Sequence, residues 1–320
     1  MIEPQNVIYE VFPDADREVE GALELVAEEG ELQIGCFSGI PYEKRSGVVR
    51  TLQMLVPLRR GETYDLYPFE DLAGRVTYPL IVFVQGSAWF RQETHQSAGV
   101  LSRLAARGFI VAIVQYREST IAPFPAQIED AKTAVRFLRA NAEKFCIDPE
   151  NIFLMGDSSG GHTALMAGIT ADAELNHADD LDADGCPKVS CAVNAIIELY
   201  GPTDITVMNE VPSTQDHTVP MSPEGMLIGG KNVLENRAEA ERTIVMNYIG
   251  ANAIPPILMM HGTKDRLVPF DQSVRLYEKL RACEKEVTFW KVKGADHADG
   301  SFYGERAYDI IEEFVREHMK

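Results

Sequence analysis

The chain has 320 residues, 45% of them hydrophobic, which is enough to bury one large core. Its 30 basic and 49 acidic residues give a formal net charge of −19. Such a surface repels the phosphates of nucleic acids and anionic lipid headgroups. We therefore expect neither a nucleic-acid partner nor a membrane partner.

The cysteines and the N-terminus indicate the compartment. An odd number of cysteines without CxxC spacing argues against a disulfide framework or a zinc ribbon, although Cys186 and Cys191 are close enough to pair under oxidising conditions. Residues 1–16 carry four acidic side chains and no apolar run, which does not fit a signal peptide. No window approaches the roughly 18 apolar residues of a membrane span. We expect a cytoplasmic protein, and the sequence leaves a homo-oligomer open.

Short apolar runs that end in turn residues recur along the chain. Continuous runs of this length are typical of strands buried on both faces, and hence of a parallel sheet. Two earlier β-rich stretches, Leu32–Phe37 and Val48–Leu55, have no long helix between them and predict an antiparallel edge. These two stretches and the six apolar runs together predict eight strands. The six runs lie near residues 80–84, 109–114, 152–155, 195–200, 257–260 and 287–292.

Amphipathic segments separate most of these runs, at Gln96–Arg107, Pro125–Lys144 and Glu305–His318. Alternating strands and helices predict an α/β fold, a single domain over residues 1–320 with helices on both faces of the sheet. Residues 205–250 break the rhythm with prolines, methionines and one helical run near Glu235–Tyr248. We predict that this insertion forms a small cap over the C-terminal edge of the sheet.

The strongest chemical signal is Gly156-Asp157-Ser158-Ser159-Gly160-Gly161, between a predicted strand and a predicted helix. A serine hydroxyl becomes a useful nucleophile when a sharp turn exposes it beside a base. The same turn aims the N–H of Ser159 toward a developing oxyanion. We predict Ser158 as the nucleophile; the alternative is an ordinary glycine-rich turn.

A base and an acid should follow this serine in the order acid, then histidine. Of the seven histidines, His297 lies in the loop after the last strand, which reaches the edge where Ser158 is expected. Asp265 follows the preceding strand and would hold the imidazole in the correct tautomer. Asp204, one strand earlier, is the rival acid, and its other interpretation is a turn or helix cap.

The loop after residues 80–84 supplies the second oxyanion donor. We predict the N–H of Ser87, with Ala88 as the alternative, and Gly86 lets the backbone approach the substrate. Trp89 would line the pocket wall, unless it is a core residue beside the turn. Met208, from the insertion, is the other predicted substrate contact.

One further pattern suggests a metal. Residues 180–185 (Asp-Leu-Asp-Ala-Asp-Gly) copy the first half of a calcium-binding EF-hand loop. The twelfth position, which requires a bidentate glutamate, is Cys191. We therefore predict a solvated acidic loop and no metal.

Taken in order, five motifs resemble the bacterial esterase/lipase branch of the α/β-hydrolases over roughly residues 45–318. This branch is related to hormone-sensitive lipase and includes acetyl-xylan and feruloyl esterases. The resemblance implies a serine carboxylesterase without a cofactor, acting on small-molecule or oligosaccharide esters, with short acyl or hydroxycinnamoyl groups on plant-polysaccharide fragments as the expected class. The motifs are Gln85-Gly86-Ser87-Ala88-Trp89, Gly156–His162, Gly201-Pro202-Thr203-Asp204, His261–Asp265 and Gly294-Ala295-Asp296-His297.

One departure separates the chain from the hormone-sensitive-lipase relatives, which usually carry His-Gly-Gly-Gly where this chain has Gln85-Gly86-Ser87-Ala88. Backbone donors survive that change. Two alternatives to an esterase remain. A serine peptidase of the prolyl-oligopeptidase type usually carries a large N-terminal propeller and a tyrosine where this chain has Ser159. A catalytically inactive binding protein would typically lack a triad member.

Overall fold

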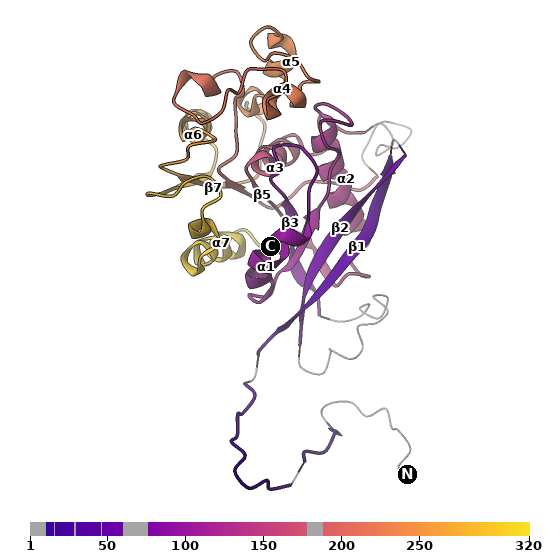
Figure 1. Ribbon diagram of the computed structural model, residues 1–320. Helices are drawn as coiled ribbons and strands as arrows, with labels where there is room; N and C mark the ends of the chain where they lie inside the picture. The colour runs from indigo at the N-terminus through magenta and orange to yellow at the C-terminus, as the bar shows by residue number, and fades with distance from the viewer. Residues whose placement is uncertain (1–10, 16, 29, 46, 60–75, 178–187) are drawn as a thin grey trace.

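The structure is a computed structural model that describes residues 11–15, 17–28, 30–45, 47–59, 76–177 and 188–320. Its centre is an eight-stranded sheet with the strand order β1-β2-β4-β3-β5-β6-β7-β8 (Figure 1). The strands are β1 (Gln33–Arg45), β2 (Val48–Leu58), β3 (Tyr78–Val84), β4 (Ile110–Val114), β5 (Ile147–Asp157), β6 (Ile196–Leu199), β7 (Ile257–Gly262) and β8 (Val287–Val292).

The pairing is parallel throughout β3 to β8, while β2 runs antiparallel to both β1 and β4. This confirms the predicted mostly parallel sheet and its antiparallel edge. Every residue of β4 is buried, as expected for a strand that is covered on both faces.

The longer helices cover both faces of the sheet. Side chains of α2, α3 and α6 join one apolar cluster, and those of α1 and α7 join the other. Helix α6 was not among the predicted helices, although Leu276 and Leu280 form its buried stripe. The five helices are α1 (His95–Ala105), α2 (Ala126–Ala140), α3 (Ser159–Thr170), α6 (Asp271–Ala282) and α7 (Glu305–Glu317).

Residues 205–250 connect β6 to β7 through short helical turns: η4 (Met208–Glu210), α4 (Pro223–Leu227), α5 (Arg237–Glu241) and η5 (Val245–Tyr248). The single helical run predicted near Glu235–Tyr248 is wrong, because α5 and η5 are separate. Between them the carbonyl oxygen of Thr243 lies 2.9 Å from His162 Nε2. This contact with α3 fixes the chain where the helix would have continued.

A buried acid lies beneath the start of α3. Glu198 of β6 is 0% exposed, and its Oε1 accepts the N–H of Gly201. Its Oε2 has no hydrogen-bond partner among the described residues. Burial raises the pKa of Glu198 to about 8, despite the opposing hydrogen bond from Gly201.

The raised pKa predicts a pH-dependent loss of stability. Folding favours the protonated acid, so this stabilisation is present below the unfolded-state pKa of about 4.3 and is lost as the pH rises toward 8. Glu198→Gln keeps the shape without the charge. Between pH 4.5 and 8.5, the free energy of unfolding should fall on the order of 3 kcal/mol more in the wild type than in the variant. Denaturant unfolding at each pH measures this, and parallel curves would contradict it.

Candidate active site

Ser158 lies in a sharp turn between β5 and α3, with a φ of +51°. A positive φ is strained for a residue with a side chain, and such strain tends to occur at functional sites. The glycines around it are required by close packing. A Cβ on Gly156 would lie 2.2 Å from the carbonyl oxygen of Gly160, and one on Gly160 would lie 2.0 Å from that of Val84. The turn therefore brings Ser158 to the end of β5 only if both positions lack side chains.

The structure brings Ser158, His297 and Asp265 together from the loops that follow β5, β8 and β7. His297 Nε2 is 2.9 Å from Ser158 Oγ, and His297 Nδ1 is 2.7 Å from Asp265 Oδ2. A carboxylate only accepts, so Nδ1 carries the hydrogen and Nε2 is left to accept the serine proton. The side chain of His297 is 14% exposed and that of Asp265 is 0% exposed.

The carboxylate of Asp265 is held on both oxygens. Oδ1 accepts the N–H groups of Leu267 and Val268, each over 2.9 Å. Oδ2 contacts His297 and a second imidazole, that of His261, at 3.2 Å. Burial by itself would raise the pKa of Asp265, but the hydrogen bonds from the two histidines lower it to about 2. Asp265 is therefore charged at neutral pH.

Asp204, the rival acid, forms its side-chain hydrogen bonds within its own turn. Its Oδ1 accepts the N–H and the hydroxyl of Thr206, over 2.9 Å and 2.6 Å, and its own N–H donates to Gln272 Oε1. This is the turn-capping role that was its alternative interpretation. Of the two aspartates, Asp265 is the one that the structure places against His297.

In the loop after β3, the free backbone N–H lies one residue later than predicted. The N–H of Ser87 donates to Ser159 Oγ over 2.9 Å, so it is already bonded within the protein. Among the described residues, the N–H groups of Ala88 and Ser159 have no hydrogen-bond partner. Of the donors considered, the free N–H in this loop therefore belongs to the alternative, Ala88, and not to Ser87.

Gly86 packs directly against the nucleophile turn. Its N–H donates to Asp157 Oδ1 over 2.6 Å, and a Cβ there would lie 2.6 Å from the carbonyl oxygen of Asp157. The close contact with the turn therefore explains by itself why position 86 is a glycine, without any contribution from a substrate.

A half-buried carboxylate next to Ser158, that of Asp157, was missed by the sequence reasoning. Asp157 Oδ2 accepts hydrogen bonds from the hydroxyls of Tyr303, over 3.0 Å, and Tyr200, over 3.3 Å. The ring of Tyr200 meets the imidazole of His297 edge-on at 4.9 Å. Burial raises the pKa of Asp157, and the bond from Gly86 opposes that shift. No sequence spacing links these residues, because 146 positions separate Asp157 from Tyr303.

The two predicted substrate contacts with large side chains are wrong. Trp89 is 1% exposed and packs edge-on against His162 at 5.3 Å, so it is the core tryptophan of the alternative interpretation. Met208 is 0% exposed within the same apolar cluster, whereas Met221 is 78% exposed. A large apolar side chain gains more from full burial than from lining an open pocket.

A cavity of about 620 Å³ adjoins the loop after β7 that carries Asp265, which we call the acid loop. The cavity wall includes Asp265 but neither Ser158 nor His297, so the cavity lies beside the Ser158–His297 pair and not around it. Residues 212–214 of the insertion reach this loop, where the N–H of Thr214 donates to the carbonyl oxygen of Arg266 over 2.8 Å. The lining residues are Pro212, Ser213, Thr214, Lys264, Asp265, Arg266, Gly294 and Asp296.

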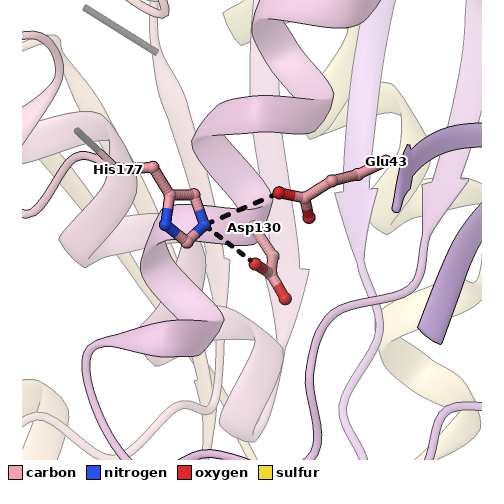
Figure 2. A group of neighbouring side chains, drawn as sticks. All are labelled: Glu43, Asp130 and His177. Carbon is pink, nitrogen blue, oxygen red and sulfur yellow. Dashed lines mark hydrogen bonds and ion pairs between the residues drawn. The ribbon is translucent and has the colours of Figure 1, made fainter. Parts of the chain in front are cut away.

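Glu43, Asp130 and His177 point toward one another at a spacing that could hold a metal ion (Figure 2). His177 Nε2 lies 3.3 Å from Asp130 Oδ1 and 3.7 Å from Glu43 Oε1. Arginines already occupy these carboxylates: Arg117 Nε is 3.0 Å from both oxygens of Asp130, and Arg50 Nε is 2.9 Å from Glu43 Oε2. Their positive charges would repel a cation, so the cluster is an ion-pair network.

The predicted acidic loop at 180–185 and the candidate disulfide partner Cys186 lie outside the described residues. Cys191 is described and is a free thiol 3.2 Å from Asp172 Oδ1.

In the described part of the chain, no helix combines the length and the apolar composition that crossing a membrane requires.

Known proteins resemble this chain over most of its length. The BD-FAE family matches residues 65–280. Esterase LipC from Mycobacterium tuberculosis is 30% identical over 266 residues, which cover 78% of this chain and 61% of LipC. A solved structure titled as a truncated carbohydrate esterase from gut microbiota has a TM-score of 0.74 at 28% identity, covering 91% of this chain and 98% of that one.

Other matches are to longer proteins. A bifunctional GH43-CE protein from Bacteroides eggerthii has a TM-score of 0.71 at 28% identity, over 88% of this chain and 38% of that one. This chain spans only 61%, 55% and 58% of the first three curated relatives, all mycobacterial proteins named as esterases or carboxylic ester hydrolases. The family match nevertheless covers more than half of this chain, and the strand order and pairing agree with it: the chain belongs to the BD-FAE family of α/β-hydrolases.

Proposed function

We propose that the chain is a serine carboxylesterase that works through an acyl-enzyme intermediate. The observation that carries the proposal is the continuous hydrogen-bond chain from Ser158 Oγ through His297 to Asp265. Esterase names among the relatives support the same reaction class.

In the proposed reaction, Ser158 Oγ attacks the ester carbonyl carbon and its proton passes to His297 Nε2. The carbonyl oxygen becomes an oxyanion, which accepts hydrogen bonds from the N–H groups of Ala88 and Ser159. His297 then protonates the leaving alcohol. Water, deprotonated by His297, releases the acid and regenerates Ser158. Asp265 stabilises the imidazolium in both halves, and no cofactor is needed.

For the substrate, we propose short-chain acyl or hydroxycinnamoyl esters on carbohydrate. Support comes from the similarity to the carbohydrate esterase and to the bifunctional GH43-CE protein. The net charge of −19 also disfavours docking on an anionic lipid interface. Residues 205–250 would contribute as a cap through segment 212–214, which is bonded to the acid loop, rather than through buried Met208.

The first prediction concerns the nucleophile and base. Ser158→Ala and His297→Ala should each lower kcat on p-nitrophenyl acetate by roughly 10³-fold or more, and the double variant should lose little beyond that, since the two act as a unit. Circular dichroism and thermal melting should show folded variants. An active-serine phosphonate should label the wild type and not Ser158→Ala. Substantial turnover by a folded Ser158→Ala protein would refute the assignment, and preferential cleavage of aminoacyl-proline amides would indicate a peptidase.

The second prediction separates the two aspartates. Asp265→Asn should leave His297 in the wrong tautomer and lower kcat by as much as about 10⁴-fold. Asp204→Asn is the matched control, because it makes the same chemical change in a turn that does not contact His297; it should mainly lower the melting temperature. The assignment is wrong if Asp204→Asn damages kcat more than Asp265→Asn while its melting temperature is unchanged.

The third prediction concerns acyl length. Each buried methylene adds about 0.8 kcal/mol of binding only if an apolar wall receives it, and the two large apolar side chains predicted to line the site, Trp89 and Met208, are buried in the core instead. We expect kcat/KM to be highest on acetyl to butyryl or hydroxycinnamoyl esters and to decline beyond about eight carbons. A series of p-nitrophenyl esters from acetate to palmitate measures this. A maximum at laurate or longer would exclude the short-acyl proposal and leave the triad untouched.

A further inference from the structure

His261, the second imidazole on the acid, belongs to β7 and is 0% exposed. Its Nε2 lies 3.0 Å from the carbonyl oxygen of Val268 and 3.2 Å from Asp265 Oδ2. Its Nδ1 lies 2.7 Å from Ser273 Oγ of α6. The ring of Phe270 covers it edge-on at 5.5 Å. The imidazole therefore connects the strand, the acid loop and the next helix.

These contacts determine which nitrogen carries the hydrogen. A carbonyl oxygen can only accept, so Nε2 must be the donor: its hydrogen bond goes to the carbonyl oxygen of Val268, and the same nitrogen lies 3.2 Å from Asp265 Oδ2. The hydroxyl of Ser273 can donate to Nδ1. A neutral imidazole thus satisfies both nitrogens of this buried ring, and among the described residues Asp265 is the charged group in direct contact with it.

We propose that His261 is a positioning residue for the acid of the triad: its Nε2–H holds Asp265 Oδ2 in the orientation that receives His297 Nδ1. The inference rests on the proposed function. The acid loop is otherwise closed by its own backbone, since Asp265 Oδ1 accepts from Leu267 and Val268. In the described structure, His261 and His297 are the two side chains whose ring nitrogens lie against the carboxylate, at 3.2 Å and 2.7 Å from Oδ2.

Removing this donor has two consequences. The carboxylate loses a restraint on Oδ2, so His297 is aligned with Ser158 for less of the time and kcat falls. His297 is then the one imidazole that interacts with Asp265 Oδ2. The negative charge of the carboxylate therefore stabilises the protonated ring of His297 more strongly. The acid limb of the kcat/KM profile should consequently move to higher pH.

The experiment compares two amides at the same position. His261→Gln extends its amide to the place of Nε2 and can still donate to Asp265. His261→Asn reaches only the place of Nδ1 and cannot. We expect the Asn variant to lose about tenfold or more in kcat, with a smaller change in KM and an acid limb displaced upward by about half a pH unit or more. The Gln variant should retain most of the kcat and the wild-type profile.

Ser273→Ala is the matched control, because it removes the other hydrogen bond of the same buried ring. It should lower the melting temperature and leave the midpoint of the acid limb in place. The inference is overturned if folded Asn and Gln variants have equal kcat and equal pH profiles, or if Ser273→Ala displaces the profile as far as His261→Asn does.

A readout without turnover separates this inference from the proposed function. Proton NMR follows the titration of the His297 ring in the wild type and in the Asn and Gln variants. A midpoint displaced upward in the Asn variant alone supports the inference even if the wild type hydrolyses no ester and reacts with no phosphonate. Identical His297 titrations in all three proteins overturn it even if the wild type is an active esterase.

Discussion

The site depends on one close backbone contact, between the end of β3 and the first turn of α3. A Cβ on Gly160 would overlap the carbonyl oxygen of Val84, and one on Gly86 would overlap that of Asp157. With no side chains in between, the loop after β3 lies directly against the turn that carries Ser158. Among the described residues, the N–H groups of Ala88 and Ser159, one on each side of this contact, have no hydrogen-bond partner. A single added methyl group in this contact would separate the two halves of the oxyanion site.

Two carboxylates, the half-buried Asp157 and the buried Asp265, hold the loops around this contact. Asp157 joins the loop after β3, through Gly86, to the segment after His297, through Tyr303. Asp265 joins the loops after β7 and β8 through its bond to His297. Burying an acid is costly unless donors surround it, and each oxygen of both residues has at least one donor. The polar network therefore holds the geometry of the proposed triad on loops that the apolar core alone would leave free to move.

The segment between β6 and β7 has a different character from the cap expected of it. Its methionines do not form a common wall, since Met208 is within the core and Met221 faces solvent. What the segment contributes is a set of polar contacts to the acid loop, from Ser213 Oγ to the carbonyl oxygen of Leu267 and from Thr214 to that of Arg266. The segment thus contacts the loop of Asp265 through these two residues and the helix after Ser158 through Thr243.

The sequence by itself determined the sheet, most of its helices and the sharp turn at Ser158, and it singled out the three residues of the proposed triad, because these follow from local pattern. Apolar runs report burial on both faces, glycines report close approach, and the order of Ser158, Asp265 and His297 follows from the fold. It could not determine which of Ser87 and Ala88 keeps a free N–H, because that depends on the Ser159 hydroxyl 72 positions away. Trp89 and Met208 look the same in sequence whether they face the core or a pocket. The contacts of Asp157 with Tyr303 and of His261 with Asp265 likewise appear only when the loops meet. A hydrogen bond depends on distances of a few tenths of an ångström, and only the packed tertiary structure sets those distances.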